Sequence, residues 1–349
     1  MITANSLSGG RTSSFMGLHF PADHDIFACV EQEAYKYTRE TALARDKIVG
    51  LNEAQDWLRM FHPGFWMSAE DDLTLVAMHK LTQDLGLISG HGAKYGKIQV
   101  VFAHNWGKTK YKTYDDIVKD FLPNSGKRLC TEVLKIEPMY NYIRSRISKV
   151  DPVEMRLGFR IDELDRTVNI YFKQVDIKDR VPNPSFDMQA VINMCKIPDY
   201  LVRWWDIMDI EGSVKKGERV FKKVPFNYYK SDYYRIPSFP LIEHGVTHAE
   251  IVKYWKGRPD YVFPKISNCV MCFHHKINEL QQQWANKSNW NRMQWADDAE
   301  KSKPRRTFKR EKRGKKSYPM PMEKILSLPI QMQIDFIDFA TCDSGTCTD

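Results

Sequence analysis

Short apolar stretches alternate along the chain with longer stretches whose apolar residues recur at helical spacing. The apolar stretches predict strands at residues 2–7, 25–30, 98–103, 154–159 and 168–175. The periodic stretches predict helices at residues 33–59, 71–85, 131–148, 187–208 and 247–255. Strands that alternate with helices favour a parallel sheet with crossover helices, so the pattern predicts an α/β fold.

The first predicted strand ends in the turn Ser8-Gly9-Gly10, before a predicted helix that begins near Ser13. Glycine lets the backbone approach an anion closely, and the first amides of a helix point at it with the helix dipole behind them. The same string fits an ordinary capped turn with Ser13 as the N-cap. It matches neither a Walker loop nor Gly-x-Gly-x-x-Gly, which disfavours those two nucleotide-binding folds. A phosphate cradle and a capped turn both remain open.

Charged side chains follow the fourth predicted strand, at Arg160, Asp162, Glu163 and Arg166. Ligands of open α/β sheets bind beyond the carboxyl ends of the strands. Carboxylates there suit Mg²⁺ binding or general-base catalysis, and arginines suit phosphate. The alternative is a surface cluster of salt bridges, which contributes little to stability.

Four cysteines fall into two compact pairs, Cys269-x-x-Cys272 and Cys342-x4-Cys347. This spacing suits a metal site, and a reducing cytoplasm disfavours disulfides. Four thiolates fit either Zn²⁺ or a [4Fe-4S] cluster, and the spacing does not choose between them. Two histidines could replace one thiolate, and a buried, inert thiol is the simplest expectation for the other cysteines. These residues are His274 and His275, and Cys29, Cys130 and Cys195.

The net charge of +8 is concentrated in one short run. Residues 301–316, KSKPRRTFKREKRGKK, hold ten Lys or Arg against one acid, so the rest of the chain is close to neutral. With Pro304, Gly314 and almost no apolar residues, the run is most simply a solvated, mobile insert. Its alternative role is a contact with the phosphate backbone of RNA or DNA.

Segments 34–95 and 180–235 are long for simple crossovers and predict insertions around a substrate. The second segment interleaves aromatic and basic residues, as a surface that stacks on bases requires. Core packing is the commoner role of aromatic doublets. The residues concerned are Trp204, Trp205, Tyr228, Tyr229, Tyr233 and Tyr234, with Arg203, Lys230 and Arg235.

The 349 residues suffice for one elaborated α/β domain or two smaller ones. The first twenty or so residues lack the basic start and apolar core of a signal peptide, and no apolar run reaches membrane-spanning length. The sequence therefore predicts a soluble, cytoplasmic protein without a membrane partner. Its oligomeric state is not predicted.

The motifs together resemble the phosphoadenosine phosphosulfate reductase-like proteins of the ATP pyrophosphatase (PP-loop) superfamily, a branch common in phages. The string Ser-Gly-Gly-Arg-x-Ser at 8–13 is similar to their pyrophosphate loop. Residues 127–131 with Lys135 resemble an Arg-x-Cys-Thr…Lys block, and residues 158–163 resemble a Gly-x-Arg-x-Asp-Glu block. Residues 240–255 and the two cysteine pairs resemble the remaining blocks, and all stand in the family order.

The resemblance implies a Rossmann-like (HUP-type) parallel sheet flanked by helices, with helical insertions and a C-terminal Cys-rich metal-binding region. It places a nucleotide-binding domain at 1–265, with insertions at about 34–95 and 180–235. It places a C-terminal helical region at 266–349, which contains the four-Cys site and the basic insert. A virus-encoded protein that acts in a bacterial cytoplasm fits this family.

The implied function is cleavage of the α–β bond of ATP with Mg²⁺, which adenylates an acceptor during nucleobase or nucleic-acid modification or sulfur transfer. Fixed donors and cations stabilise the departing pyrophosphate. The resemblance assigns nucleotide binding to Ser8, Gly9, Gly10, Arg11, Thr12, Ser13, Arg128, Arg160 and Arg166. It assigns catalysis to Arg11, Lys135, Asp162 and Glu163, and a [4Fe-4S] cluster or Zn²⁺ to Cys269, Cys272, Cys342 and Cys347.

Departures from the family pattern keep two alternatives open. The chain lacks the Glu-Cys-Gly-Leu-His motif of sulfonucleotide reductases, which disfavours reductase activity. Position 12 is Thr where many relatives have Asp, and position 11 is Arg rather than Lys, so the nucleotide is less well defined. The alternatives are a sulfonucleotide reductase, and a nucleic-acid-binding protein with a degenerate nucleotide pocket and structural zinc.

Overall fold

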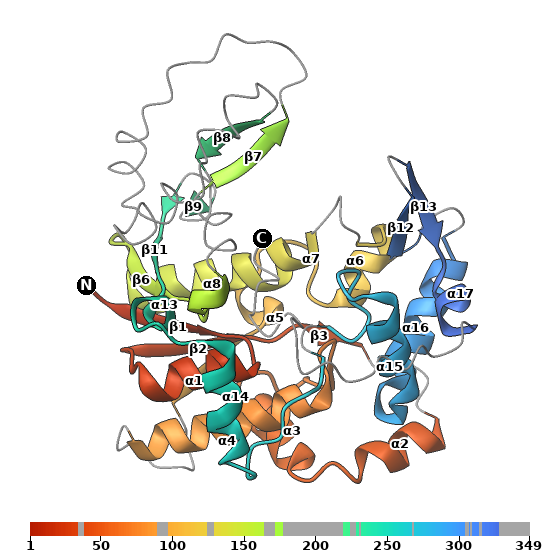
Figure 1. The fold of residues 1–349 in the computed structure, drawn as a ribbon, viewed down its shortest axis with the longest axis horizontal. Helices are drawn as coiled ribbons and strands as arrows, with labels where there is room; N and C mark the ends of the chain where they lie inside the picture. The colour runs from red at the N-terminus through yellow and green to blue at the C-terminus, as the bar shows by residue number, and fades with distance from the viewer. Residues whose placement is uncertain are drawn as a thin grey trace.

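A parallel sheet of five strands forms the centre of the molecule (Figure 1). Its strands, from one edge to the other, are β11 (Arg235–Ser238), β6 (Val153–Arg156), β1 (Thr3–Leu7), β2 (His24–Ala28) and β5 (Ile98–Val101). The computed structural model describes residues 1–33, 38–88, 97–123, 129–163, 172–176, 219–223, 228–229, 232–266, 269–303, 307, 309–313 and 316–327. The predicted α/β class and its parallel sheet are confirmed.

The strand order reverses direction at β1, which lies in the middle of the sheet. The chain first adds β2 and β5 on one side of β1, and then β6 and β11 on the other. The carboxyl ends of β1 and β6 therefore meet at a topological switch point, where open α/β sheets bind their ligands.

Helices cover both faces of this sheet, with α1, α4 and α14 on one face and α8 on the other (Figure 1). The helices in the first half of the chain are α1 (Arg11–His19), α2 (Arg39–Arg45), α3 (Leu51–Arg59), α4 (Asp72–Ile88), α5 (Ala103–Trp106), α6 (Tyr114–Asp120), α7 (Leu129–Thr131) and α8 (Glu137–Tyr142). The later ones are α13 (Pro240–Glu243), α14 (His248–Lys256), α15 (Ile277–Ala285), α16 (Trp290–Lys301) and α17 (Met322–Ser327).

Shorter turns complete these helices. The π-helical stretches Glu132–Ile136 and Ile143–Ile147 join α7 and α8 into one helical segment, as predicted for residues 131–148. Single 3₁₀ turns span Ile161–Glu163 and Lys287–Asn289.

Four antiparallel strand pairs lie outside the main sheet. They are β3 (Glu31–Gln32) with β4 (Met67–Ser68), β7 (Phe172–Asp176) with β8 (Arg219–Lys223), β9 (Tyr228–Tyr229) with β10 (Asp232–Tyr233), and β12 (Lys309–Arg313) with β13 (Lys316–Met320).

Two predicted elements differ from the structure. The strand expected at 168–175 in the parallel sheet is β7, which pairs antiparallel with β8, and β11 is the fifth parallel strand instead. The helix expected at 33–59 is divided into α2 and α3, because Gly50 adopts a left-handed conformation with φ of 82° and begins a new helix. The helix predicted at 187–208 lies outside the described residues.

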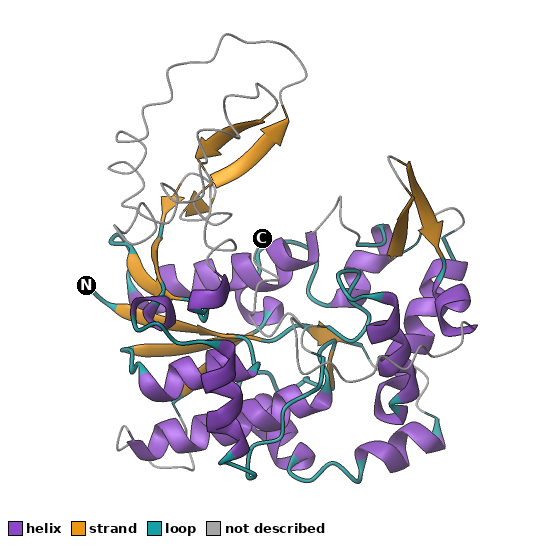
Figure 2. Ribbon diagram, in the orientation of Figure 1, coloured by secondary structure: helices purple, strands orange, loops and turns teal. Residues whose placement is uncertain are grey.

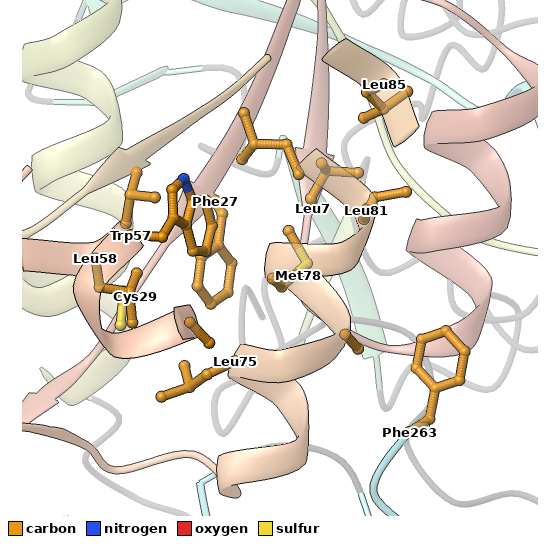
Figure 3. Packing of buried hydrophobic residues seen from close by; sticks show 14 of the residues in the cluster. Leu7, Phe27, Cys29, Trp57, Leu58, Leu75, Met78, Leu81, Leu85 and Phe263 are labelled. Atoms are coloured by element: carbon orange, nitrogen blue, oxygen red, sulfur yellow. The ribbon is translucent and has the colours of Figure 1, made fainter. Parts of the chain in front are cut away.

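One hydrophobic cluster packs the sheet against α3 and α4 (Figure 3). It contains Leu7 and Phe27 from the central strands, and Trp57 and Met78 from the two helices. A second cluster joins the ends of the strands to the C-terminal helices, which lie together beside the sheet (Figure 2). Its members include Val30, Ala103, Val270, Met293 and Met322, so residues on both sides of position 265 share this core.

The basic run does not match the irregular insert that its composition predicts. Its residues 309–313 form β12, and residue 316 begins β13, with Arg313 paired to Lys316 across the hairpin. This hairpin extends from the C-terminal helices (Figure 2).

The structure describes only some of the aromatic residues of segment 180–235, for which core packing or base stacking was predicted. Tyr234 is fully buried and meets the Tyr140 ring edge-on, with ring centroids 5.1 Å apart. Arg235 is buried beside it, with its guanidinium 5.0 Å from the Tyr234 ring. Core packing is therefore confirmed for Tyr234. Tyr228, Tyr229 and Tyr233 lie in the β9–β10 pair, whereas Trp204, Trp205, Arg203 and Lys230 lie outside the described residues.

No helix in the described ranges combines the length and the apolar character needed to cross a membrane.

Candidate functional site

The turn between β1 and α1 is built around the Ser13 hydroxyl. Ser8 donates its backbone N–H to Ser13 Oγ at 3.1 Å, and the two serine hydroxyls lie 2.9 Å apart. Ser13 Oγ also donates to the carbonyl oxygen of Gly10 at 3.2 Å. Gly10 is the N-cap residue of α1 and supplies no side-chain cap, so the first amides of the helix are not capped by a side chain. The predicted cap by Ser13 is wrong, because Ser13 lies within the helix and is bonded backwards into the turn.

Gly9 is required at its position for two reasons. Its φ of +78° lies in the left-handed region, which L side chains rarely adopt. A Cβ atom on Gly9 would also lie 2.3 Å from Cγ2 of Thr74 on α4. The turn is therefore held between the sheet and α4 with no space for a side chain.

The segment after β6 packs directly on this turn. A Cβ atom on Gly158 would lie 3.2 Å from Cα of Ser13, so glycine allows the two backbones to approach closely. Two residues later, Arg160 donates from Nη1 to Oγ1 of Thr12 at 2.8 Å. Thr12 and Arg160 are both buried. The structure thus brings together two sequence-predicted blocks that are almost 150 residues apart in the chain.

Two carboxylates hold the Arg160 guanidinium in place. Asp162 Oδ1 lies 3.1 Å from Nε, and Glu163 Oε2 lies 3.3 Å from Nη2. Arg160 and Glu163 are buried, so this cluster differs from an exposed salt bridge. Because both carboxylates contact Arg160, the geometry makes them positioning residues for that cation.

Arg11 begins α1 and is held through its backbone. The indole Nε1 of Trp255 on α14 donates to the Arg11 carbonyl oxygen at 3.0 Å. Within the described part of the chain, no hydrogen bond or ion pair engages the Arg11 guanidinium, which leaves it available to an anion at the turn. The helix α14 itself starts with a capping box formed by Thr247 and Glu250.

Lys135 pairs with a buried carboxylate in the structure. Its Nζ lies 2.9 Å from Oε1 of Glu70, a nearly fully buried carboxylate just before α4. Lys135 and Thr131 line one pocket. The backbone of Glu70 forms an isolated β-bridge with Cys269, so this ion pair lies beside the cysteine motif.

Cys269 and Cys272 form a tight turn, in which the N–H of Cys272 donates to the Cys269 carbonyl at 2.9 Å. Both line the pocket that also contains Cys130, His274 and Lys135. Cys130, which we expected to be inert, therefore accompanies the cysteine pair. His275 contacts the same turn through Nε2, which lies 2.9 Å from the Cys269 carbonyl oxygen.

Several predicted site residues cannot be placed. Cys342, Cys347, Arg128 and Arg166 lie outside the described residues, as does Cys195. Cys29 is buried, and burial raises the pKa of its thiol, which fits the inert role expected for it.

A further group of side chains, not predicted from the sequence, lies beyond the carboxyl ends of β2 and β5. Glu31, His62 and His104 place one ligand atom each within 4.8 Å of the others. Glu31 and His104 directly follow the predicted strands 25–30 and 98–103. Their position after strand ends could have marked them as candidate ligand-binding residues. His62 had no comparable signal, because it follows α3 in a loop.

Comparisons of this chain with models of known protein families, with curated proteins and with solved structures find no match.

Proposed function

We propose that this protein is a PP-loop enzyme that binds ATP and cleaves its α–β bond, transferring the adenylyl group to an acceptor. The observation that carries the proposal is the meeting of the Ser8–Ser13 turn with Arg160 at the topological switch point of the sheet. Ligands of open α/β sheets bind at this place.

The turn has the features that a pyrophosphate needs. Uncapped amides at the start of α1 offer hydrogen-bond donors, and the helix dipole favours a negative charge there. Arg11 supplies a cation without an ion-pair partner among the described residues, and Arg160 supplies one that is held against Thr12. Cleavage of the α–β bond places negative charge on the departing pyrophosphate, and preorganised donors and cations stabilise that charge.

Mg²⁺ is the usual partner of ATP in this chemistry and would be bound chiefly by the nucleotide's own phosphates. Asp162 and Glu163 already contact Arg160, so their role in the proposal is to hold that cation. The sequence lacks the Glu-Cys-Gly-Leu-His motif of sulfonucleotide reductases, which favours ATP over a sulfonucleotide.

The cysteine pocket is the proposed site of a metal group. The donor types fit Zn²⁺ or an iron-sulfur cluster, since Cys130, Cys269, Cys272 and His274 line one pocket. No three of their ligand atoms lie within 4.8 Å of one another among the described residues. When bound, Zn²⁺ would supply a structural cross-link, and an iron-sulfur cluster would supply sulfur chemistry. Metal and labile-sulfide analysis after anaerobic purification would distinguish the two groups.

The basic hairpin favours nucleic acid as the acceptor. The run that contains β12 carries ten Lys or Arg against one acid, and cations of this density bind phosphate backbones. Sequence-independent contacts of this kind weaken steeply as salt increases.

A nucleotide-binding experiment tests the proposed function before the acceptor is known. We expect ATP to bind the full-length protein with Mg²⁺ and AMP to bind much more weakly, because AMP lacks the pyrophosphate. Arg160→Met should weaken ATP binding at least tenfold, an effect of about 1.4 kcal/mol. Arg156→Met is the matched control, since Arg156 lies on the same segment but donates to the Pro21 carbonyl at the far end of α1.

Equal affinity for ATP and AMP, or unchanged ATP binding in Arg160→Met, would contradict the proposal. Preferential binding of adenylyl sulfates, with sulfite release in the presence of a thiol, would establish the reductase alternative instead. If ATP binds, the protein is next incubated with labelled ATP and one candidate acceptor at a time. Formation of AMP and pyrophosphate then identifies the acceptor substrate.

A further inference from the structure

Three side chains from separate segments converge beyond the ends of β2 and β5. Glu31 lies in β3, just after β2, and His104 lies in α5, just after β5. His62 comes from the loop after α3. Oε2 of Glu31 lies 2.9 Å from Nδ1 of His104 and 3.3 Å from Nε2 of His62.

The shared oxygen atom faces two imidazole nitrogens but, within the described part of the chain, accepts no hydrogen bond. Glu31 has a side chain only 8% exposed, and its Oε2 is fully shielded from solvent. A buried carboxylate oxygen without a hydrogen bond is costly, and neutral imidazoles do not offset its charge, so the arrangement favours a bound cation.

We propose that Glu31, His62 and His104 bind a divalent transition-metal ion such as Zn²⁺, Fe²⁺ or Mn²⁺. Metal–ligand bonds of about 2.0–2.2 Å place neighbouring ligand atoms roughly 3–3.5 Å apart, which fits both contacts of Glu31. Two imidazoles and one carboxylate form a donor set typical of such ions.

The ligands are held in place by their own segments. The two imidazole rings stack with centroids 4.5 Å apart, and His62 also packs on Phe102. Asn105, next to His104, donates from Nδ2 to the carbonyl of Phe61, next to His62, at 2.7 Å. This bond ties together the two segments that carry the histidines.

The electrostatic surroundings favour a bound cation. Glu33, Asp115 and Asp116 all act on the charge of Glu31, so the cluster lies among further carboxylates. A divalent cation would offset this concentration of negative charge.

The site would leave part of the metal's coordination shell open. His104 has a side chain 37% exposed, so one side of the cluster faces solvent. Three protein ligands with open positions are characteristic of metals that bind water or a substrate, whereas structural zinc sites are closed by four protein ligands. None of the three ligands lines the cysteine pocket, and the site does not depend on the proposed ATP chemistry.

Cobalt spectroscopy on the full-length protein tests this inference without any nucleotide. After removal of metals with a chelator, Co²⁺ should bind with visible d–d bands but without thiolate charge-transfer bands, which separates this site from any site at the cysteines. His104→Gln should weaken this binding at least tenfold, and Glu31→Gln and His62→Gln should do the same. His79→Gln is the matched control, because His79 is half-buried on α4 and lies outside the cluster.

Isothermal titration with Mn²⁺ provides a second measurement, since thiolates disfavour this ion. The inference is overturned if the three cluster variants bind Co²⁺ and Mn²⁺ as the wild-type protein does, or if the wild-type protein binds only thiolate-ligated Co²⁺. Because His104 is partly exposed, His104→Gln should fold even if the substitution of the more buried Glu31 or His62 prevents folding.

Discussion

Arg160 is a buried cation whose charge is balanced by the two carboxylates that follow it. Asp162 and Glu163 hold its guanidinium, and its Nη1 is directed at Thr12 in the first turn of α1. Burying a cation is costly unless it is paired, so this short segment carries its own compensation. The result is a guanidinium fixed in position beside the turn, which an approaching phosphate does not have to organise.

Replacing Gly9 tests how tightly the turn is held. In Gly9→Ala, the new methyl group would meet Thr74 at 2.3 Å in a left-handed backbone. We expect the free energy of unfolding to fall by about 2–4 kcal/mol, the sum of backbone strain and overpacking. Urea denaturation with an unchanged m value measures this loss.

Gly245→Ala provides the matched control for Gly9→Ala. Gly245 also has a left-handed φ, of +65°, but a Cβ atom there would meet nothing within 4 Å. Only the backbone strain of about 1–2 kcal/mol is expected. Adding Thr74→Ala to Gly9→Ala should recover part of the stability, whereas equal losses in the two glycine variants would show that Thr74 does not confine the turn.

Candidate site residues could be identified from the sequence where they belong to a local motif. Gly9, Ser13 and Arg160 were identified because strand ends and glycine turns are visible in the sequence. The Glu70–Lys135 ion pair and the position of Cys130 beside Cys269 were not, because they depend on contacts between distant segments. Sequence spacing constrains neighbours on one helix, but it contains little information about which helix lies opposite.

Helix α14 contacts the turn between β1 and α1 from a distant part of the sequence. It begins at the Thr247–Glu250 capping box, and its Trp255 donates a hydrogen bond to Arg11 at the start of α1. The spacing of its apolar residues made this helix predictable at 247–255. The break between α2 and α3 was not predicted, because a glycine inside a periodic stretch only weakens a helix in most settings. In this case α2 ends at Arg45, and the left-handed Gly50 is the N-cap of α3.

Removing the cap of α14 should destabilise the protein modestly. Thr247→Ala deletes the hydroxyl that accepts a hydrogen bond from the Glu250 amide. We expect a loss of about 1 kcal/mol in the free energy of unfolding, together with faster hydrogen exchange in the first turn of α14. Lys253→Ala, on the same helix, should change both measurements little. Equal effects of the two substitutions would exclude a special role for the cap.

Across the whole molecule, the C-terminal helices are joined to the sheet domain by a buried ionic network as well as by the shared core. Arg292 of α16 is fully buried, and its Nη2 lies 2.7 Å from Oδ1 of Asp72 at the start of α4. Arg45 of α2 contacts the other oxygen of Asp72, with its Nε 2.7 Å from Oδ2. Arg292 also donates from Nε to the Ser68 carbonyl at 2.8 Å. The network therefore connects three parts of the chain.

Breaking this network should cost much more than breaking an exposed ion pair. Arg292→Met leaves Asp72 buried with one cation instead of two, and we expect a loss of about 3–5 kcal/mol in the free energy of unfolding. The control is Lys301→Met, which removes a pair with Asp297 on the same helix. The side chain of Lys301 is 54% exposed, so a change of at most about 1 kcal/mol is expected. Similar losses in the two variants would show that the buried network contributes nothing special.

The same network predicts how stability depends on pH. Burial alone would raise the pKa of Asp72, but Arg292 and Arg45 outweigh it and lower this pKa below its ordinary value of 3.8. Because the folded state then binds the proton more weakly than the unfolded state, the contribution of Asp72 is complete above about pH 4 and is lost as the pH falls below that value. Asp72→Asn removes the titrating group, so its free energy of unfolding should fall less steeply in acid than that of the wild-type protein. Urea denaturation at several pH values from about 5 to 2.5 measures both slopes, and parallel curves would show that Asp72 is not held ionised by the two arginines.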